Sequence, residues 1–257
     1  MPRFRLLPTI FACCCFWAML GLLLGATVRI PGVGFTLGLL FGIIYVVLGT
    51  FGSVKFALEM WNARLLDQSA APNLYEMLRE LCDLTDVPLP SLYASPEHEP
   101  NAFVVAGRDG ESAIVVTHGL TRRLSEDEVQ AVMALMIARL ATGAMADWTT
   151  AAALAGLPLY WGRRVSPLLN KPCAALLRLT CQPGILQAAD SHAAHLSATP
   201  AVLFSALTSI EAAYPEESVH AGNPATALLF AAPPYAHFVS TWPTVQERID
   251  KVDVGRL

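Results

Sequence analysis

The stretch LSEDEVQAVMALMIARLATG, residues 124–143, predicts a long helix with a well-defined start. Ser125 is followed three positions later by Glu128, which is the pattern of a capping box, where each residue's side chain bonds to the other's backbone N–H. The acidic residues of the first turn also suit the positive end of the helix dipole. The helix is expected to run from this cap to about Gly143.

Short β-rich pieces precede this helix. An earlier segment, Asn73–Leu84, has apolar residues at helical spacing and is followed by two prolines. Three pieces rich in strand-forming residues come next, at 91–94, 102–106 and 113–117. The turn Gly107-Arg108-Asp109-Gly110 separates the last two, so they are expected to form a hairpin.

The first 55 residues contain no acidic residue, and their only bases are Arg3, Arg5, Arg29 and Lys55. Both uncharged runs between these bases exceed the roughly 20 residues that a helix needs to cross a bilayer. Residues 1–60 therefore predict a transmembrane helical hairpin with its turn at 29–34. The positive-inside rule places the domain formed by residues 61–257 in the cytoplasm. The alternative for the first run is a cleaved signal peptide.

The composition agrees with a membrane anchor. Hydrophobic residues make up 54% of the chain and charged residues 15%, which excludes intrinsic disorder. The net charge of −4 gives no support to a nucleic-acid partner. Cys82, Cys173 and Cys181 lack the close spacing of a zinc site and are expected to be free thiols.

The order of these pieces resembles the HtpX family of membrane zinc metallopeptidases. The resemblance rests on Asn101-Ala102-Phe103, Gly107, Val116-Thr117-x-Gly119-Leu120, Leu124-x-x-x-Glu128-x-x-x-Val132, Ala189-Asp190, Pro200, Ala206-Leu207-x-x-Ile210, Ser240-Thr241-Trp242-Pro243 and Arg248-Ile249. It implies a membrane α-helical hairpin followed by a mostly helical, zincin-like α+β domain with a small β-sheet.

The family's catalytic residues are replaced here. The helix that carries His-Glu-x-x-His in the family has Leu135, Met136 and Arg139 at those positions, and the third zinc ligand corresponds to Leu186. The family's closing His-Pro is Trp242-Pro243. Leucine has no donor atom, methionine is a soft ligand and arginine is permanently cationic. The sequence therefore predicts a pseudo-peptidase with no catalytic residue, no metal ligand and no zinc.

The replaced positions raise two questions, namely which partner Arg139 has and whether other residues bind a metal. In the family the Asp of the second block orients a zinc-binding His, so an Arg139–Asp190 ion pair is expected where the metal would join two helices. Its alternative is an Arg139 that points to solvent. Asp190, His192 and His195 are the best candidates for a reassigned metal site, against the alternative of an ordinary helix of mixed polarity.

A further apolar run lies between the two helical blocks. Residues 148–162 carry no charge and end at Arg163 and Arg164. As a helix they would measure about 22 Å, short of a bilayer core of about 30 Å. The segment 148–181 is therefore expected to hold an interfacial or re-entrant helix, and the alternative is a buried core helix.

These observations favour a catalytically inactive membrane protein with a binding, regulatory or accessory role. By resemblance, the strand that begins at Asn101, Ala102 and Phe103 would accept an extended peptide by strand addition. The expected partners are the lipid bilayer and a protein, whether a membrane complex, a homologous peptidase or a client. The expected location is the inner (cytoplasmic) membrane. The alternative function is a metalloendopeptidase with a reassigned metal site.

Overall fold

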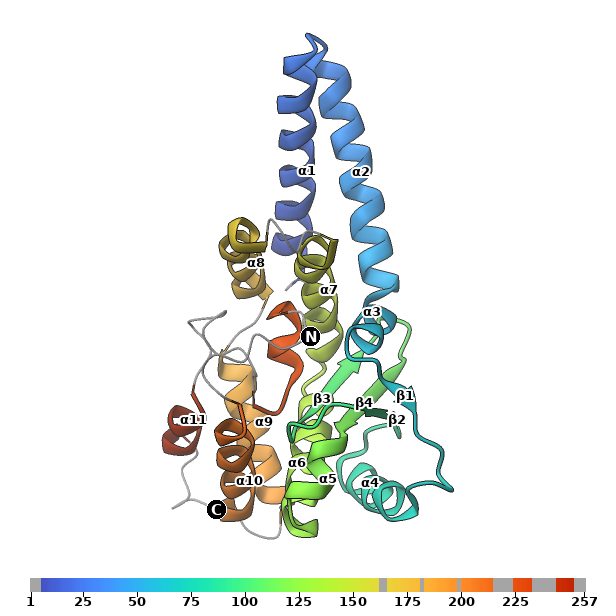
Figure 1. Ribbon diagram of the computed structural model, residues 1–257, viewed down its shortest axis with the longest axis vertical. Helices are drawn as coiled ribbons and strands as arrows, with labels where there is room; N and C mark the ends of the chain where they lie inside the picture. Colours follow the sequence, from blue (N-terminus) through green and yellow to red (C-terminus); the bar gives the residue numbers. More distant parts are fainter. Residues whose placement is uncertain are drawn as a thin grey trace.

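The computed structural model describes residues 6–161, 166–180, 183–197, 200–214, 224–232 and 244–251 (Figure 1). Its elements follow the chain in this order: α1 Leu7–Thr27, α2 Pro31–Phe51, α3 Ser53–Met60, β1 Arg64–Leu65, α4 Pro72–Thr85, β2 Ser91–Ser95, β3 Ala102–Ala106, β4 Ser112–Thr117, α5 His118–Arg123, α6 Glu126–Ala141, α7 Met145–Trp161, α8 Ser166–Thr180, α9 Pro183–Leu196, α10 Pro200–Ala212, the 3₁₀ helix η1 Pro224–Leu229, and α11 Val245–Lys251.

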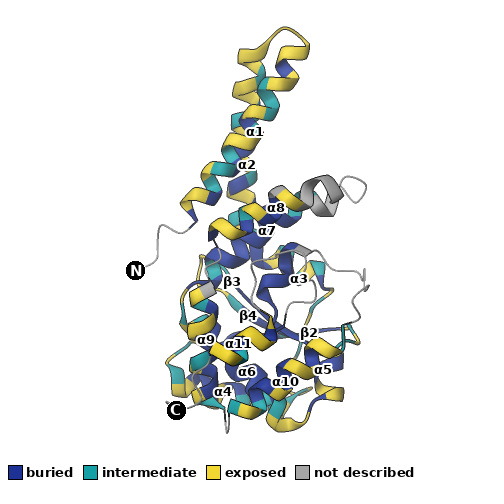
Figure 2. Cartoon of the chain, turned by 90° about the vertical axis from the view of Figure 1, so that its left-hand side faces the viewer, coloured by how far each residue is buried: buried dark blue, intermediate teal, exposed yellow. Residues whose placement is uncertain are grey.

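Helices α1 and α2 form the hairpin that the sequence predicts. They stand away from the rest of the protein at one end (Figures 1 and 2). The turn is shorter than expected, because α2 begins at Pro31, whose fixed φ suits the first position of a helix. Arg29 turns the chain with a φ of 63°.

Glycines allow the two hairpin helices to approach each other closely. A Cβ added at Gly25 would lie 2.9 Å from the Cα of Gly34, and one added at Gly38 would lie 3.0 Å from the Cα of Gly21. The spacing of four residues puts each set on one helix face, which is the usual way that membrane helices bring their backbones together. The hairpin is thus held by backbone contact.

The outer surface of the hairpin is apolar. Large hydrophobic side chains are exposed along both helices, including Phe11, Leu24, Leu37 and Phe51. Both helices are long and apolar enough to cross a membrane. Within the described residues, a third span would be counted only if α6 and α7, bent by 93° at their junction, were taken as one. An exposed apolar surface of this extent requires lipid.

The domain that follows the hairpin contains a four-stranded sheet with the strand order β1-β2-β4-β3. β2 and β4 are parallel, whereas β1 pairs antiparallel with β2, and β3 pairs antiparallel with β4. The predicted hairpin of the last two strands is therefore confirmed. The small mixed sheet among many helices confirms the expected fold class.

Helix α6 is fixed at its start by the predicted capping box. The Ser125 N–H donates to Glu128, and the Glu128 N–H donates to the Ser125 hydroxyl. Ser205 of α10 donates a further hydrogen bond to the same carboxylate. The Ser125 N–H first, and the hydroxyls of Ser205 and Ser125, lower the pKa of Glu128 despite partial desolvation. This end of α6 is thus fastened to α10.

Helix α7 begins inside the protein. All described side chains from Trp148 to Ala155 are buried, so the first half of the apolar run is a core helix. The residues at 162–165, which include Arg163 and Arg164, lie outside the described part. Cys82 and Cys173 are free thiols, as predicted, and Cys181 also lies outside it.

We expect Gly38→Ala to destabilise the hairpin, because its Cβ would meet the backbone of α1. Overpacking of a tight contact costs about 1–3 kcal/mol. The matched control is Gly32→Ala, where a Cβ meets nothing within 4 Å and alanine favours the helix. Thermal unfolding in detergent should show a lower midpoint for the first variant only. Equal midpoints for the two variants would contradict close backbone packing.

Candidate functional site

Helix α6 carries the positions that correspond to the family's metal motif into the centre of the protein. Leu135 and Met136 are fully buried, and Arg139 is 1% exposed. Leu135 and Arg139 are four residues apart and therefore share a helix face. The three methylene groups and the guanidinium of a buried arginine are thus placed where the motif's second ligand would stand.

Helix α9 packs against α6 and supplies the other positions. Leu186 is fully buried in the same hydrophobic core as Leu135 and Met136. Asp190, one turn later, is 1% exposed. Trp242 lies outside the described residues. The four corresponding positions hold Leu135, Met136, Arg139 and Leu186. None of these side chains offers an imidazole nitrogen, a thiolate or a carboxylate oxygen, so these four residues do not fit zinc.

Arg139 donates its hydrogen bonds to backbone carbonyls. Nη1 donates to the carbonyl oxygens of Leu229 and Phe230 at 3.1 and 2.6 Å, and Nη2 donates to Ala231 at 3.4 Å. Its Nε is buried and has no partner among the described residues. Arg139 is buried rather than directed to solvent, and no carboxylate among the described residues is a direct partner of its guanidinium.

The predicted Arg139–Asp190 ion pair is wrong, because Asp190 pairs with Arg248 of α11. Nε and Nη2 of Arg248 donate to the two oxygens of Asp190 at 2.8 and 2.6 Å. Both residues are almost completely buried, and the pair is bidentate, which is the strong geometry for these groups. Nη1 of Arg248 also donates to the Ala231 carbonyl at 2.7 Å. The two arginines therefore converge on one stretch of backbone.

Arg139, Arg248 and Asp190 form a buried cluster with two positive charges and one negative charge. Burial first, and then repulsion from Arg248, lower the pKa of Arg139 to about 9, while Asp190 acts in the opposite direction. Arg139 therefore stays protonated at neutral pH. Among the described residues, the carboxylate of Asp190 offsets the positive charge of the two guanidinium groups.

The backbone held by the arginines belongs to residues 225–232, here called the covering segment. All of its residues are buried. Phe230 forms an antiparallel bridge with Phe103 of β3, and the Ala231 N–H donates to the Ala102 carbonyl at 2.8 Å. The ring centroids of Phe103 and Phe230 are 4.7 Å apart. The chain thus pairs its own backbone with the outer edge of β3.

This arrangement corrects the prediction for Asn101, Ala102 and Phe103. All three residues are fully buried, and Asn101 Nδ2 donates to the Ala232 carbonyl at 2.7 Å. The strand edge expected to accept a peptide is occupied by the covering segment. A peptide could reach it only by displacing that segment.

The candidate reassigned metal site is not assembled. His192 and His195 are exposed on α9, whereas Asp190 is buried and already bound to Arg248. Within the described ranges no group of three or more His, Cys, Asp or Glu side chains could hold a metal ion.

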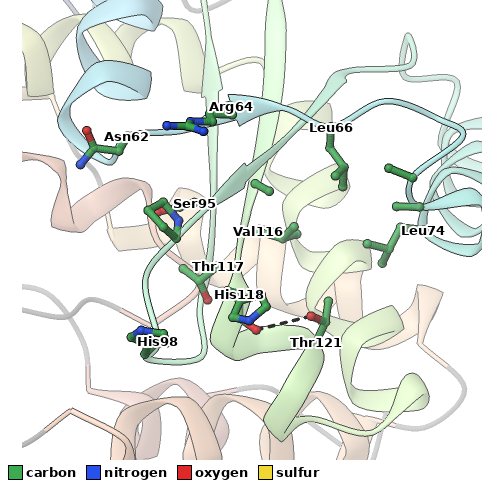
Figure 3. A pocket seen from close by; sticks show the side chains of 14 residues that line it. Asn62, Arg64, Leu66, Leu74, Ser95, His98, Val116, Thr117, His118 and Thr121 are labelled. Atoms are coloured by element: carbon green, nitrogen blue, oxygen red, sulfur yellow. Dashed lines mark hydrogen bonds between the residues drawn. The ribbon is translucent and has the colours of Figure 1, made fainter.

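A separate groove of about 960 Å³ lies at the carboxyl ends of β2 and β4 (Figure 3). Its lining includes Arg64, His98 and His118 but no acidic residue. The two imidazole centroids are 6.2 Å apart. The sequence patterns did not predict this groove, although the carboxyl ends of neighbouring parallel strands commonly form such crevices.

Known proteins resemble the chain over most of its length. A family profile described as Peptidase family M48 matches residues 68–158. A "Protease HtpX homolog" from Thermococcus kodakarensis is 30% identical, over 92% of this chain and 94% of the relative. Another from Burkholderia multivorans is 30% identical, over 85% and 86%.

One solved structure shares the fold. The crystal structure of S. mikatae Ste24p matches 98% of this chain with a TM-score of 0.52 and 15% identity. The chain spans 65% of the length of that protein.

We expect Asp190→Asn to unfold the protein more readily, because it leaves Arg139 and Arg248 buried without a counter-charge. Removing one partner of a buried pair costs about 3–5 kcal/mol. Asp83→Asn on the exposed side of α4 is the control and should change stability little. Chemical denaturation of the purified chain in detergent measures both. An Asp190→Asn variant as stable as the control would contradict the assigned charge balance.

Proposed function

Because the chain belongs to the HtpX family of membrane metallopeptidases, within peptidase family M48, we propose that it keeps the family's anchored scaffold without the family's zinc chemistry. It is a catalytically inactive integral membrane protein that acts as a binding, regulatory or accessory subunit. The observation that carries this proposal is the guanidinium of Arg139, buried at a ligand position and bound to three backbone carbonyls.

The proposal follows from what peptide hydrolysis requires. Zinc supplies an activated water, and a nearby carboxylate takes the proton of that water. Leu135 and Leu186 have no donor atoms, and Met136 replaces the carboxylate. The positive charge of Arg139 also opposes a cation at the same place. These substitutions remove the ligands and the base together.

The covering segment supports the same conclusion. A substrate peptide would need an extended backbone beside β3, where Phe230 and Ala231 already lie. Both arginines hold this backbone by its carbonyl groups, so its displacement would leave several buried polar groups without partners. A closed centre of this kind suits a binding protein better than a hydrolase.

The placement in the cell is part of the proposal. The hairpin spans the inner membrane twice, and the bases at its two ends keep the larger domain in the cytoplasm. The partner is a protein of a membrane complex, a homologous peptidase or a membrane client.

Zinc analysis of the full chain, purified in detergent beside the Thermococcus kodakarensis relative, tests the proposal. We expect far less than one zinc per chain and no hydrolysis of an unfolded substrate protein, because the described residues bring no set of metal ligands together. Stoichiometric zinc with hydrolysis would overturn it. If that zinc were lost in the double variant His192→Ala, His195→Ala, the metalloendopeptidase with a reassigned site would take its place.

A further inference from the structure

Helix α8 lies at the base of the transmembrane hairpin, on the side of the domain (Figure 2). The hydroxyls of Thr9 in α1 and Thr180 in α8 are hydrogen-bonded to each other. Leu176 of α8 packs with Cys13 of α1 and Val46 of α2. The helix is therefore fixed against the first two turns of α1.

The length of the hairpin sets the depth of these turns. Each hairpin helix has 21 residues, which gives about 31 Å at 1.5 Å per residue, close to the roughly 30 Å of a hydrocarbon core. Spanning that core places both domain-side ends of the hairpin at its boundary. Helix α8 then lies at the level of the lipid headgroups.

The exposed face of α8 combines two bases with an apolar residue. Lys171, Ala175 and Arg178 are exposed and follow the spacing of one helix face, and Leu179 beside them is 49% exposed. The opposite face carries the buried residues Cys173, Ala174, Leu177 and Thr180. The helix is amphipathic, with an exposed face that carries both bases.

The surrounding sequence strengthens this charge pattern. No acidic residue occurs from 148 to 189, whereas Arg163, Arg164, Lys171 and Arg178 give the same segment a charge of +4. Because the whole chain has a net charge of −4, the rest of it carries −8. The part of the sequence that contains α8 is thus positively charged, in contrast to the rest of the chain.

We propose that α8 lies in the headgroup layer of the domain-side leaflet and binds anionic phospholipid through Lys171 and Arg178. Bases beside a membrane are attracted to anionic headgroups, and a helix with an apolar residue next to its bases lies in the plane of the interface. Leu179 enters the upper acyl region. The proposal is independent of whether the protein has catalytic activity.

Photo-crosslinking of the full chain tests this placement. A benzophenone amino acid replaces Ala175, and the protein is reconstituted in phosphatidylcholine vesicles with or without phosphatidylglycerol. We expect mass spectrometry to find crosslinked phospholipid, enriched in phosphatidylglycerol when it is present. The same amino acid at the exposed position of Asp83 should give no lipid adduct. Absence of lipid adducts at 175 would overturn the proposal.

Charge variants separate anionic lipid binding from proximity alone. Each base near an anionic surface contributes a factor of about five, so removing both in Lys171→Gln with Arg178→Gln should lower the phosphatidylglycerol enrichment about 25-fold. The matched control is Arg122→Gln with Arg123→Gln on the exposed side of α5, which should leave the enrichment unchanged. Unchanged enrichment in the α8 variant, or adducts to another protein in native membranes in place of lipid, would contradict the proposal.

Discussion

The guanidinium of Arg139 determines the arrangement of the protein's centre. A buried arginine needs acceptors, and this one takes them from the carbonyl groups of Leu229, Phe230 and Ala231. That requirement fixes the covering segment against β3. The second arginine, Arg248, reaches the same backbone and brings Asp190 with it. Helices α6, α9 and α11 are therefore joined through hydrogen bonds and charge.

This junction joins helices of the family's scaffold through charge and hydrogen bonds. A metal would connect α6 to α9 through coordination bonds, and the arginine network provides a connection built from side chains and backbone alone. Leu135, Met136 and Leu186 then extend the hydrophobic core into space that polar ligands would otherwise occupy. These positions are thus filled by groups of the hydrophobic core that stabilise the fold.

Sequence patterns predicted the elements that are determined by residues close together in the sequence. The uncharged runs predicted the hairpin, and Ser125 with Glu128 predicted the start of α6. The partner of Arg139 was missed because it lies 90 residues away and consists of backbone carbonyls, which no residue type reveals. The covering segment is short and rich in alanine, without the alternation of a strand. The pair of Asp190 with Arg248 also depends on tertiary packing alone.

Hydrogen exchange at the covering segment tests the central claim most directly. The Ala231 N–H is bonded to the Ala102 carbonyl, so peptides from residues 225–232 should be protected in the full chain. In Arg139→Met the carbonyls of Leu229 and Phe230 lose their side-chain donor, and these peptides should exchange faster. Arg123→Met on exposed α5 should leave them protected. Rapid exchange in the unaltered chain, or unchanged protection in Arg139→Met, would contradict an arginine-held centre.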